Sequence, residues 1–390
     1  MKYNFHEIVD RKNSDSIKWG NLEELYGDKD VLPLWIADMD FKSPDEVIEA
    51  FKERADHGVF GYTWKRDSLY NAVIDWVKRR FNWDIKKEWI LFTPGVVSGL
   101  NIGVRGLTKE GEKVLVQPPV YPPFYRVIHN SRRIANKSPL KHNGERYVMD
   151  YEELESKIDE ETKLMMLCSP HNPVGRVWTE EELTRLGDIC IKNDIIIISD
   201  EIHCDFVLKG HRHIPLASMS KELAERTITL MAPSKTFNIA GLSTSIAIIP
   251  NEKLRSIYQE EIEAMEIDNI TIFGALGLEV AYNNGEQWLS EVLEYIEENI
   301  DFAVDYIDKN IPEIKVDRPD GTYLLWLDFR GIDKSPDEIN KALIEVGKVA
   351  LNDGRPYGDE GEGFFRLNIG CPRPILEEGL KRIEKAIKSL

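Results

Sequence analysis

Short apolar runs alternate with amphipathic stretches through the middle of the chain. The runs have the length and composition of buried strands, and they occupy residues 90–93, 114–117, 164–168, 195–199, 227–231 and 246–249. Apolar residues recur at helical spacing over 96–107, and a capping box of Thr179 and Glu182 begins a second predicted helix that extends to about residue 193. Strands that alternate with helices predict an α/β domain with a mainly parallel central sheet flanked by helices.

The pattern changes on either side of this region. Ser43, Pro44 and Glu46 predict a helix that is capped by Ser43 and runs to about residue 56. After the central region a long acidic amphipathic helix is predicted at 286–309. It precedes two strand-like runs and a closing helix, which are residues 323–329, 363–370 and 375–390. These elements predict a smaller α+β domain.

We therefore expect three parts in the chain: an N-terminal segment, 1–45, that packs with the small domain, a large domain, 46–284, and a small C-terminal domain, 285–390. A length of 390 residues agrees with two or three domains. Apolar and acidic residues are concentrated at 34–41. This stretch is either a buried extended segment or backbone that borders a site, and the pattern does not separate the two.

The composition is that of an ordinary globular protein, with 42% hydrophobic and 30% charged residues. The net charge is −18, from 50 basic against 68 acidic residues, and this charge opposes attraction to nucleic acid or to anionic lipid. The apolar runs fall far short of the ~20 residues that a membrane helix needs, and the first residues lack the apolar core of a signal peptide. We expect a cytoplasmic protein that binds neither nucleic acid nor membrane.

The cysteines and histidines show no complete metal-ligand spacing. The four cysteines are widely separated, which predicts buried, reduced thiols; they are Cys168, Cys190, Cys204 and Cys371. Three histidines lie close to Cys204 in the sequence, at positions 203, 211 and 213, without the spacing of a zinc site. No metal is predicted.

The side chains with the clearest chemical potential follow the strand-like runs, and ligands of such sheets bind beyond the carboxyl ends of the strands. Lys235 comes shortly after the run 227–231 among small and apolar neighbours. Weak hydration there lowers the pKa of a lysine towards that of a nucleophile or base. Asp200 follows the run 195–199, where a buried charge needs a partner such as a protonated ring nitrogen. A surface lysine and a capping or turn aspartate are the ordinary alternatives.

Further positions each have a functional and an ordinary interpretation. The helix predicted to begin at Val96 leaves the amides of Val96 and Val97 free to bind an anion, as any helix start does. Asn172, next to prolines, presents its amide rigidly to a ligand oxygen or forms a turn. Tyr121 lies on a proline-stiffened loop, where it stacks on a flat cofactor or packs as an ordinary aromatic. Arg366 interrupts an apolar strand and needs an internal carboxylate or an anionic ligand.

Taken together, these residues resemble those of the fold type I, pyridoxal 5′-phosphate (PLP)-dependent aminotransferase superfamily and, within it, of the MalY/PatB cystathionine β-lyase branch. The resemblance covers essentially the whole chain. Its motifs, in chain order, are Leu34–Phe41, Asn172-Pro173-Val174-Gly175, Asp200-Glu201-Ile202-His203 and Ala232–Leu242. It implies a PLP-dependent transferase-like fold whose large domain binds the cofactor.

The resemblance also implies a role for each candidate residue. Lys235 corresponds to the Schiff-base lysine that also acts as general base, Asp200 to the partner of the pyridinium nitrogen, Asn172 to the donor to the ring hydroxyl oxygen and Tyr121 to the ring-stacking aromatic. Phosphate contacts are implied for the amides of Val96 and Val97, the hydroxyl of Ser234 and Tyr62 of the neighbouring subunit; substrate contacts are implied for Arg366, Ile36 and Ala37. His203 takes the cofactor-side position where aminotransferases usually carry Tyr, and Ser243 stands where many carry a second phosphate-binding Arg. The first departure is typical of the lyase branch.

The activity implied by the resemblance is a carbon-sulfur β-lyase, with α,β-elimination of L-cystathionine, and of cysteine or its S-conjugates, to thiol, pyruvate and ammonia. The alternative is a class I/II aminotransferase, which passes nitrogen to a keto acid. A non-catalytic binding or regulatory protein is disfavoured, because every position implied to contact the cofactor holds a residue that can make that contact. The resemblance further implies PLP as cofactor, a small amino-acid substrate and a homodimer with shared active sites.

Overall fold

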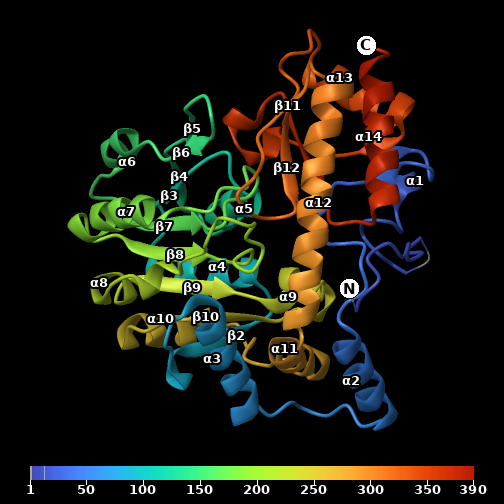
Figure 1. Ribbon diagram of the computed structural model, residues 1–390. Helices are drawn as coiled ribbons and strands as arrows, with labels where there is room; N and C mark the ends of the chain where they lie inside the picture. Colours follow the sequence, from blue (N-terminus) through green and yellow to red (C-terminus); the bar gives the residue numbers. More distant parts are fainter. Residues whose placement is uncertain (1, 13) are drawn as a thin grey trace.

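The computed structural model describes residues 2–12 and 14–390. Its largest element is a seven-stranded sheet with the strand order β2-β10-β9-β8-β7-β3-β4 (Figure 1). The strands are β2 (Ile90–Thr93), β3 (Lys113–Val116), β4 (Ile134–Lys137), β7 (Thr162–Cys168), β8 (Ile196–Asp200), β9 (Thr227–Met231) and β10 (Ser245–Ile248). β10 runs antiparallel to both of its neighbours, and the other neighbouring pairs are parallel. The expected α/β architecture is confirmed.

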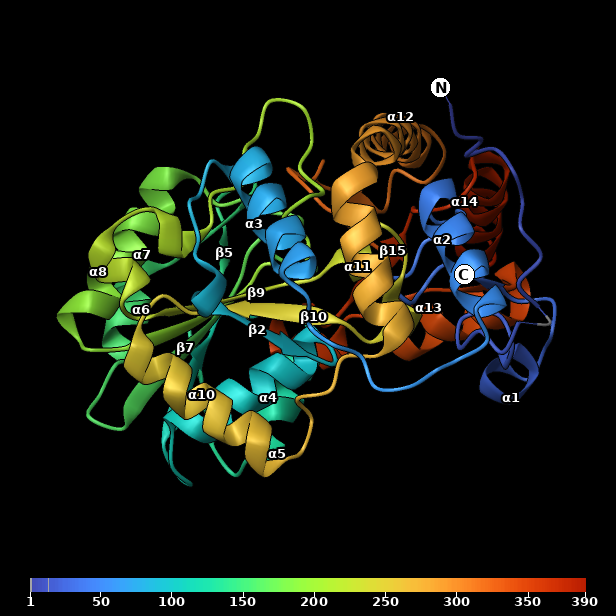
Figure 2. The ribbon, with the colours of Figure 1, turned by 90° about the horizontal axis from the view of Figure 1, so that it is seen from below.

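Helices cover both faces of this sheet (Figures 1 and 2). One face carries α4 (Val96–Leu107), α5 (Pro123–Asn130) and α10 (Glu252–Ala264), and the other carries α6 (Tyr151–Lys157), α7 (Glu180–Lys192) and α8 (Lys221–Ala224). Ile197 and Ile198 belong to different apolar clusters, because successive strand residues point to opposite faces. The predicted capping box is present at the start of α7, between Thr179 and Glu182.

The packing of α4 against the sheet is unusually close. A Cβ atom at Gly103 would come within 2.4 Å of the Ile198 side chain, so glycine is needed for this approach. Because α4 begins directly after β2, this packing holds the first turn of α4 at the carboxyl edge of the sheet.

A second sheet of four strands has the order β11-β12-β15-β14 and is antiparallel. Its strands are β11 (Lys315–Val316), β12 (Leu324–Asp328), β14 (Asn352–Asp353) and β15 (Phe364–Asn368), and the helices near it are α13 (Pro336–Ala342) and α14 (Arg373–Ile387). The long helix α12 (Glu286–Asn310) runs beside this sheet in Figure 1 and is seen end-on in Figure 2. It contacts α11 (Ile272–Asn284) at one end and β11 and α14 further along.

Residues near the N-terminus join the C-terminal part of the chain. β1 (Leu32–Pro33) pairs in parallel with β13 (Val349–Ala350). The remaining elements of the first part are α1 (Leu22–Tyr26), α2 (Asp45–Asp56) and α3 (Asp67–Phe81), and β5 (Lys141–His142) with β6 (Tyr147–Val148) forms a separate hairpin. The domain boundaries at residues 45 and 284 stay a prediction.

Two local expectations differ from the structure. α2 begins at Asp45 with Pro44 at its N-cap position, and the predicted cap by Ser43 is wrong. The Ser43 hydroxyl donates instead to the backbone carbonyl of Asn238, at 3.2 Å. The closing helix ends at Ile387 rather than at residue 390.

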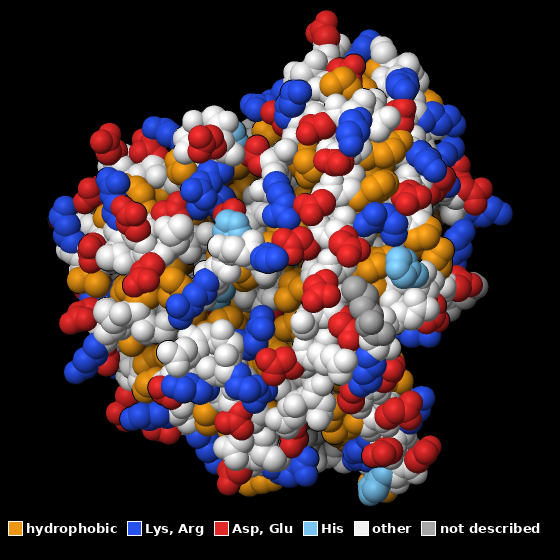
Figure 3. Space-filling model, in the orientation of Figure 1, with side chains coloured by type: hydrophobic (Ala, Val, Ile, Leu, Met, Phe, Trp, Pro, Cys, Tyr) orange, Lys and Arg blue, Asp and Glu red, His pale blue; other side chains and the backbone are white. Residues whose placement is uncertain are grey.

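Charged side chains of both signs are interspersed over the face shown in Figure 3. The four cysteines are buried free thiols, as predicted. Within residues 2–12 and 14–390, no helix has both the length and the apolar character needed to cross a membrane.

Candidate active site

A cavity of about 270 Å³ lies at the carboxyl edge of the large sheet, and most of the candidate residues line it. The lining includes Ala37, Val96, Val97, Tyr121, Asn172, Asp200, His203, Ser234 and Lys235. These residues come from the segment before α2, the start of α4, the loops after β3, β7 and β9, and the end of β8. The structure therefore brings together side chains that are widely separated in the sequence.

Lys235 lies in the short helix α9 (Pro233–Thr236), directly after β9. Its Nζ donates a hydrogen bond to the backbone carbonyl of Ala37. Burial lowers the pKa of Lys235 to about 8, and the nearby guanidinium of Arg366 acts in the same direction, whereas the carboxylates of Asp38 and Asp200 oppose the shift. An amine with this pKa has a sizeable unprotonated fraction near neutral pH, which suits a nucleophile or a base.

Asp200 is the last residue of β8, and only 3% of its surface is exposed. Within the described chain, its carboxylate accepts one hydrogen bond, from the backbone amide of Ile202 at 3.1 Å. Burial raises the pKa of Asp200 to about 7, with a smaller contribution from Glu201. A cationic N–H group in the cavity would supply the partner that this carboxylate lacks.

Arg366 does not line the cavity, but it is joined directly to Asn172, which does. Nη1 of Arg366 donates to Oδ1 of Asn172 at 3.0 Å, and Nη2 donates to Oδ1 of Asn352 at 2.7 Å and to the carbonyl of Trp35 at 2.9 Å. The guanidinium is buried, its Nε has no partner, and it forms no ion pair with a carboxylate of the described residues. A buried cation in this state favours an anionic ligand such as a substrate carboxylate.

The start of α4 forms another part of the cavity wall. Val96 and Val97 are the first residues of this twelve-residue helix, and both line the cavity with Ser234. Gly95 precedes them with φ of 150°, a conformation that residues with side chains disfavour. Free amides, the helix dipole and a serine hydroxyl together form a cradle for a phosphate group.

The whole cavity has the donor set that PLP requires. A carboxylate without a cationic partner matches the ring nitrogen, an amide matches the ring hydroxyl, and the helix start matches the phosphate. Lys235 lies within the same cavity, where its amine suits the aldehyde group. The residues present therefore fit this cofactor.

Comparison with known protein families agrees with this geometry. The family described as "Aminotransferase class I and II" matches residues 29–383. The chain belongs to this family.

Individual relatives cover the full chain. Cystathionine beta-lyase PatB of Bacillus subtilis is 42% identical over 385 residues, which are 98% of this chain and 100% of that protein. The structure of cystalysin from Treponema denticola, which contains a pyridoxal 5′-phosphate cofactor, has a TM-score of 0.97 at 37% identity and covers 100% of both chains. A PLP-bound protein from Clostridium difficile 630 with a provisional aminotransferase name has a TM-score of 0.97 at 49% identity, over 99% of this chain and 100% of that one. The resemblance to the MalY/PatB branch and the fold class are confirmed.

Two aromatic positions of this aminotransferase-family site are neutral. His203 is buried beside Tyr323, with ring centroids 5.8 Å apart, and its Nδ1 has no hydrogen-bond partner among residues 2–12 and 14–390. Burial lowers the pKa of His203 to about 3, so the ring is uncharged at neutral pH. Burial also raises the pKa of Tyr121, which therefore keeps its phenol proton.

Some predicted residues lie outside the cavity of a single chain. Tyr62 is fully exposed, at 101% of its reference surface, on a segment whose Val59, Phe60 and Trp64 are exposed as well. Ser243 is exposed and does not line the cavity. Ile36 is not part of the lining either, although its carbonyl accepts a hydrogen bond from Asn368 at 2.7 Å, one residue before the lining residue Ala37.

The sequence analysis missed several residues that hold this site. The hydroxyl of Tyr323 donates to the Ala37 carbonyl at 3.1 Å, and Asn238 and Asn368 bind the backbone around that residue. Lys18 is almost fully buried and pairs with Asp40 at 2.7 Å. Asn238 and Asp40 lie within two motifs of the family resemblance, Ala232–Leu242 and Leu34–Phe41. Lys18 lies in a polar N-terminal stretch and gives no local signal.

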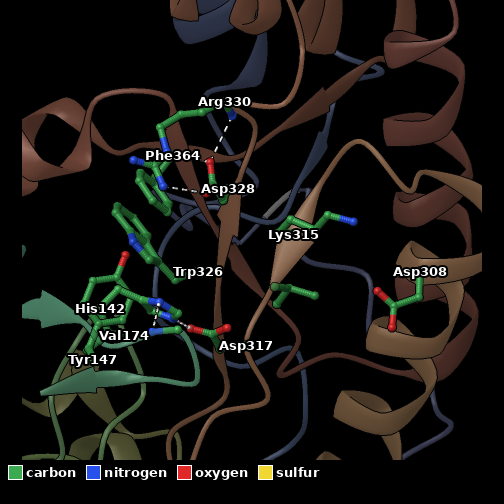
Figure 4. Close-up of a pocket in the computed structure, with 12 residues that line it drawn as sticks. His142, Tyr147, Val174, Asp308, Lys315, Asp317, Trp326, Asp328, Arg330 and Phe364 are labelled. Atoms are coloured by element: carbon green, nitrogen blue, oxygen red, sulfur yellow. Dashed lines mark hydrogen bonds and ion pairs between the residues drawn. The ribbon is translucent and has the colours of Figure 1, made fainter.

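A larger cavity of about 410 Å³ lies between the β5–β6 hairpin and the small sheet (Figure 4). Two charged pairs are formed within its wall: His142 Nε2 lies 2.8 Å from Asp317 Oδ2, and Arg330 Nη2 lies 2.7 Å from Asp328 Oδ2. Its other charged lining residues, Asp308 and Lys315, are exposed, whereas the smaller cavity holds the buried side chains of Asp200 and Lys235. We place the chemistry in the smaller one.

Proposed function

We propose that this chain is a PLP-dependent carbon-sulfur β-lyase that converts L-cystathionine to homocysteine, pyruvate and ammonia, with cysteine and its S-conjugates as further candidate substrates. The observation that carries the cofactor assignment is the pairing, in one cavity, of a buried unpartnered carboxylate with a lysine of lowered pKa, Asp200 and Lys235. The reaction type is supported by the 42% identity with cystathionine beta-lyase PatB.

The cofactor contacts follow from the positions of the lining residues. We assign the aldehyde group to Lys235, the ring nitrogen to Asp200, the ring hydroxyl oxygen to Asn172 and His203, the ring face to Tyr121, and the phosphate to the amides of Val96 and Val97 and the hydroxyl of Ser234. When bound, PLP supplies an electron sink for the negative charge that develops at the substrate α-carbon.

The side chains divide the remaining tasks. Arg366 binds the substrate α-carboxylate, because its buried guanidinium has no carboxylate partner within the described residues. Lys235 accepts the α-proton at Nζ, for which a pKa of about 8 in the cofactor-free site is suitable. Asp200 stays ionised once a cation lies against it, which preserves the charge of the ring nitrogen. The carbon-sulfur bond then breaks, and the thiolate leaves and takes a proton. Water hydrolyses the released three-carbon enamine, which yields pyruvate and ammonia.

We further propose a homodimer in which Tyr62 reaches the phosphate of the partner. The support is its full exposure together with that of Val59, Phe60 and Trp64, since a run of exposed aromatic and apolar side chains is typical of an interface. A cytoplasmic location and the boundaries at residues 45 and 284 are parts of the same proposal.

One assay tests the reaction type. The PLP-loaded protein is incubated with L-cystathionine without a keto acid, and free thiol and pyruvate are measured together. A lyase produces thiol and pyruvate in equal amounts. An aminotransferase needs a keto acid, and the amounts of thiol and pyruvate that it forms do not match. Rapid amino transfer with no thiol from any sulfur amino acid would refute the lyase proposal, and the cofactor assignment would survive.

A further inference from the structure

The segment 35–41 connects two groups that the proposed function uses. The carbonyl of Trp35 accepts a hydrogen bond from Arg366, and the carbonyl of Ala37 accepts one from Lys235. Ala37 also lines the cavity. The segment lies between β1 and α2 and belongs to neither a helix nor a strand. Its position therefore depends on contacts other than a sheet ladder.

Two asparagine side chains supply many of these contacts. Nδ2 of Asn368 donates to the carbonyls of Ile36 and Asp38 at 2.7 and 2.8 Å. Asn238 binds the following residues: its Oδ1 accepts from the Met39 amide at 3.0 Å, and its Nδ2 donates to the carbonyls of Met39 and Phe41 at 3.0 and 2.7 Å. The small sheet, through Asn368, and the lysine loop, which is residues 237–239 directly after α9, thus both hold the segment.

Asn238 is well suited to this task by its own backbone. Its φ of 55° is in the left-handed region, which Asn tolerates better than most residues. It lies only three residues after Lys235, so its side chain ties the segment directly to the lysine loop. The Ser43 hydroxyl, which donates to the Asn238 carbonyl, adds a further link beyond Phe41.

We propose that Asn238 is a positioning residue that fixes Ala37 against Lys235 in the wall of the cavity and thereby determines substrate affinity. The proposal rests on the proposed function for its substrate, an amino acid whose carboxylate binds Arg366. The structural part of the proposal is that Asn238 attaches the segment 35–41 to the lysine loop, and this part is independent of the reaction type.

The test compares Asn238→Gly with Asn82→Gly in the full-length protein. Glycine accepts positive φ and removes the three side-chain hydrogen bonds of Asn238. Asn82 is a matched control, because it also has a left-handed φ, of 53°, but is exposed at the end of α3. Amide hydrogen exchange is measured in cofactor-free and PLP-loaded protein, and kcat and KM are measured for the best amino-acid substrate.

We expect exchange at the Met39 amide and its neighbours to become about tenfold faster in Asn238→Gly, since a hydrogen bond to this amide is lost. KM should rise about tenfold while kcat stays within about threefold. Asn82→Gly should match the wild type in both measurements. Unchanged exchange over 36–41, or a loss confined to kcat, would overturn the proposal.

Asn238→Asp is the second variant and guards against misfolding of the first. It keeps the acceptor for the Met39 amide and removes the two donors to the carbonyls of Met39 and Phe41. We therefore expect slow exchange to be retained at Met39, and exchange to become faster at Asp40, whose amide donates to the Gly370 carbonyl at 2.8 Å in the loosened segment. If the wild-type protein transaminates and releases no thiol, the lyase proposal fails, while exchange and KM for the amino donor still decide the role of Asn238.

Discussion

Arg366 of β15 donates a hydrogen bond to Oδ1 of Asn172, in the loop after β7, at 3.0 Å. This contact joins the four-stranded sheet to the loop that follows β7 of the seven-stranded sheet, at the edge of the cavity. It also occupies the oxygen of the Asn172 amide, which leaves the amide nitrogen as the group available to a ligand. One side chain thus binds substrate in our proposal and orients a second residue that contacts the cofactor.

Substitution of Arg366 should therefore be more harmful than the loss of a single charge. We expect Arg366→Ala to lower kcat/KM by a factor that corresponds to ~2 to 5 kcal/mol, because the buried guanidinium that pairs with the substrate carboxylate is removed and Asn172 loses its donor. Arg330→Ala, which removes an exposed arginine paired with Asp328 in the second cavity, is the control and should retain kcat/KM. Steady-state kinetics with L-cystathionine measure both variants. Equal effects of the two substitutions would contradict the assignment.

The assignment of Lys235 as the covalent anchor of the cofactor predicts a specific label. Borohydride reduction of the PLP-loaded protein should leave one modified residue, and peptide mapping should locate it at Lys235. Lys18 is the informative comparison, because it is buried nearby but its amine donates to Asp40 at 2.7 Å. Label on Lys18, or label that persists in Lys235→Ala, would refute the assignment.

The raised pKa of Asp200 has a consequence for stability. Its pKa moves from 3.8 to about 7 on folding, so the cofactor-free folded state holds this proton more tightly than the unfolded state does. The protonated Asp200 side chain therefore contributes to the free energy of unfolding. This contribution is complete below pH 3.8 and is lost as pH rises through about 7. Above pH 7 the buried charge costs as much as about 4 kcal/mol.

Asp200→Asn should remove this cost. In cofactor-free protein we expect the variant to gain stability relative to the wild type at pH 8 and not at pH 4, as measured by urea unfolding. Addition of PLP should cancel the gain, since a cationic ring nitrogen then pairs with the wild-type carboxylate. Asp188→Asn, at an exposed position on α7, is the control. A gain of the same size at both pH values would argue against a buried, unpartnered Asp200.

The sequence predicted the elements whose signal is local. β2, β9 and α4 have the predicted bounds, because each is one continuous apolar run or helical period. Lys235 and Asp200 stood out for a similar reason, because each is a charged residue that follows an apolar strand-like run. The cap predicted at Ser43 is wrong because a tertiary contact uses its hydroxyl. Local spacing says nothing of competing partners elsewhere in the chain.

The contacts that shape the cavity wall were beyond such reasoning. Asn238 donates to the carbonyl of Met39, which lies 199 positions away in the sequence. Both residues belong to motifs of the family resemblance, but nothing in either motif shows that the two residues meet. Nor does any local pattern show that Lys18 and Asp40 meet as a buried ion pair. Only the fold brings these groups together, so their roles require coordinates.

The shared active site can be tested with mixed dimers. Tyr62 is exposed in one chain and Lys235 lies in the cavity, so in our proposal each complete site takes Tyr62 from one subunit and Lys235 from the other. Tyr62→Ala and Lys235→Ala homodimers should each have low activity. After dissociation and reassociation in equal amounts, half of the dimers are mixed, and each mixed dimer has one site with both residues intact. The expected recovery is about a quarter of the wild-type activity per subunit.

The control mixes Lys235→Ala with Asp200→Ala. Both residues line the same cavity of one chain, so a mixed dimer of these variants contains no intact site and should recover nothing. Sedimentation confirms that mixed dimers form in both experiments. If the Tyr62→Ala and Lys235→Ala mixture also recovers nothing, or if the wild type is fully active as a monomer, then Tyr62 acts within its own chain or takes no part in the site. Recovery confined to the first mixture is expected because only residues from different subunits complement each other.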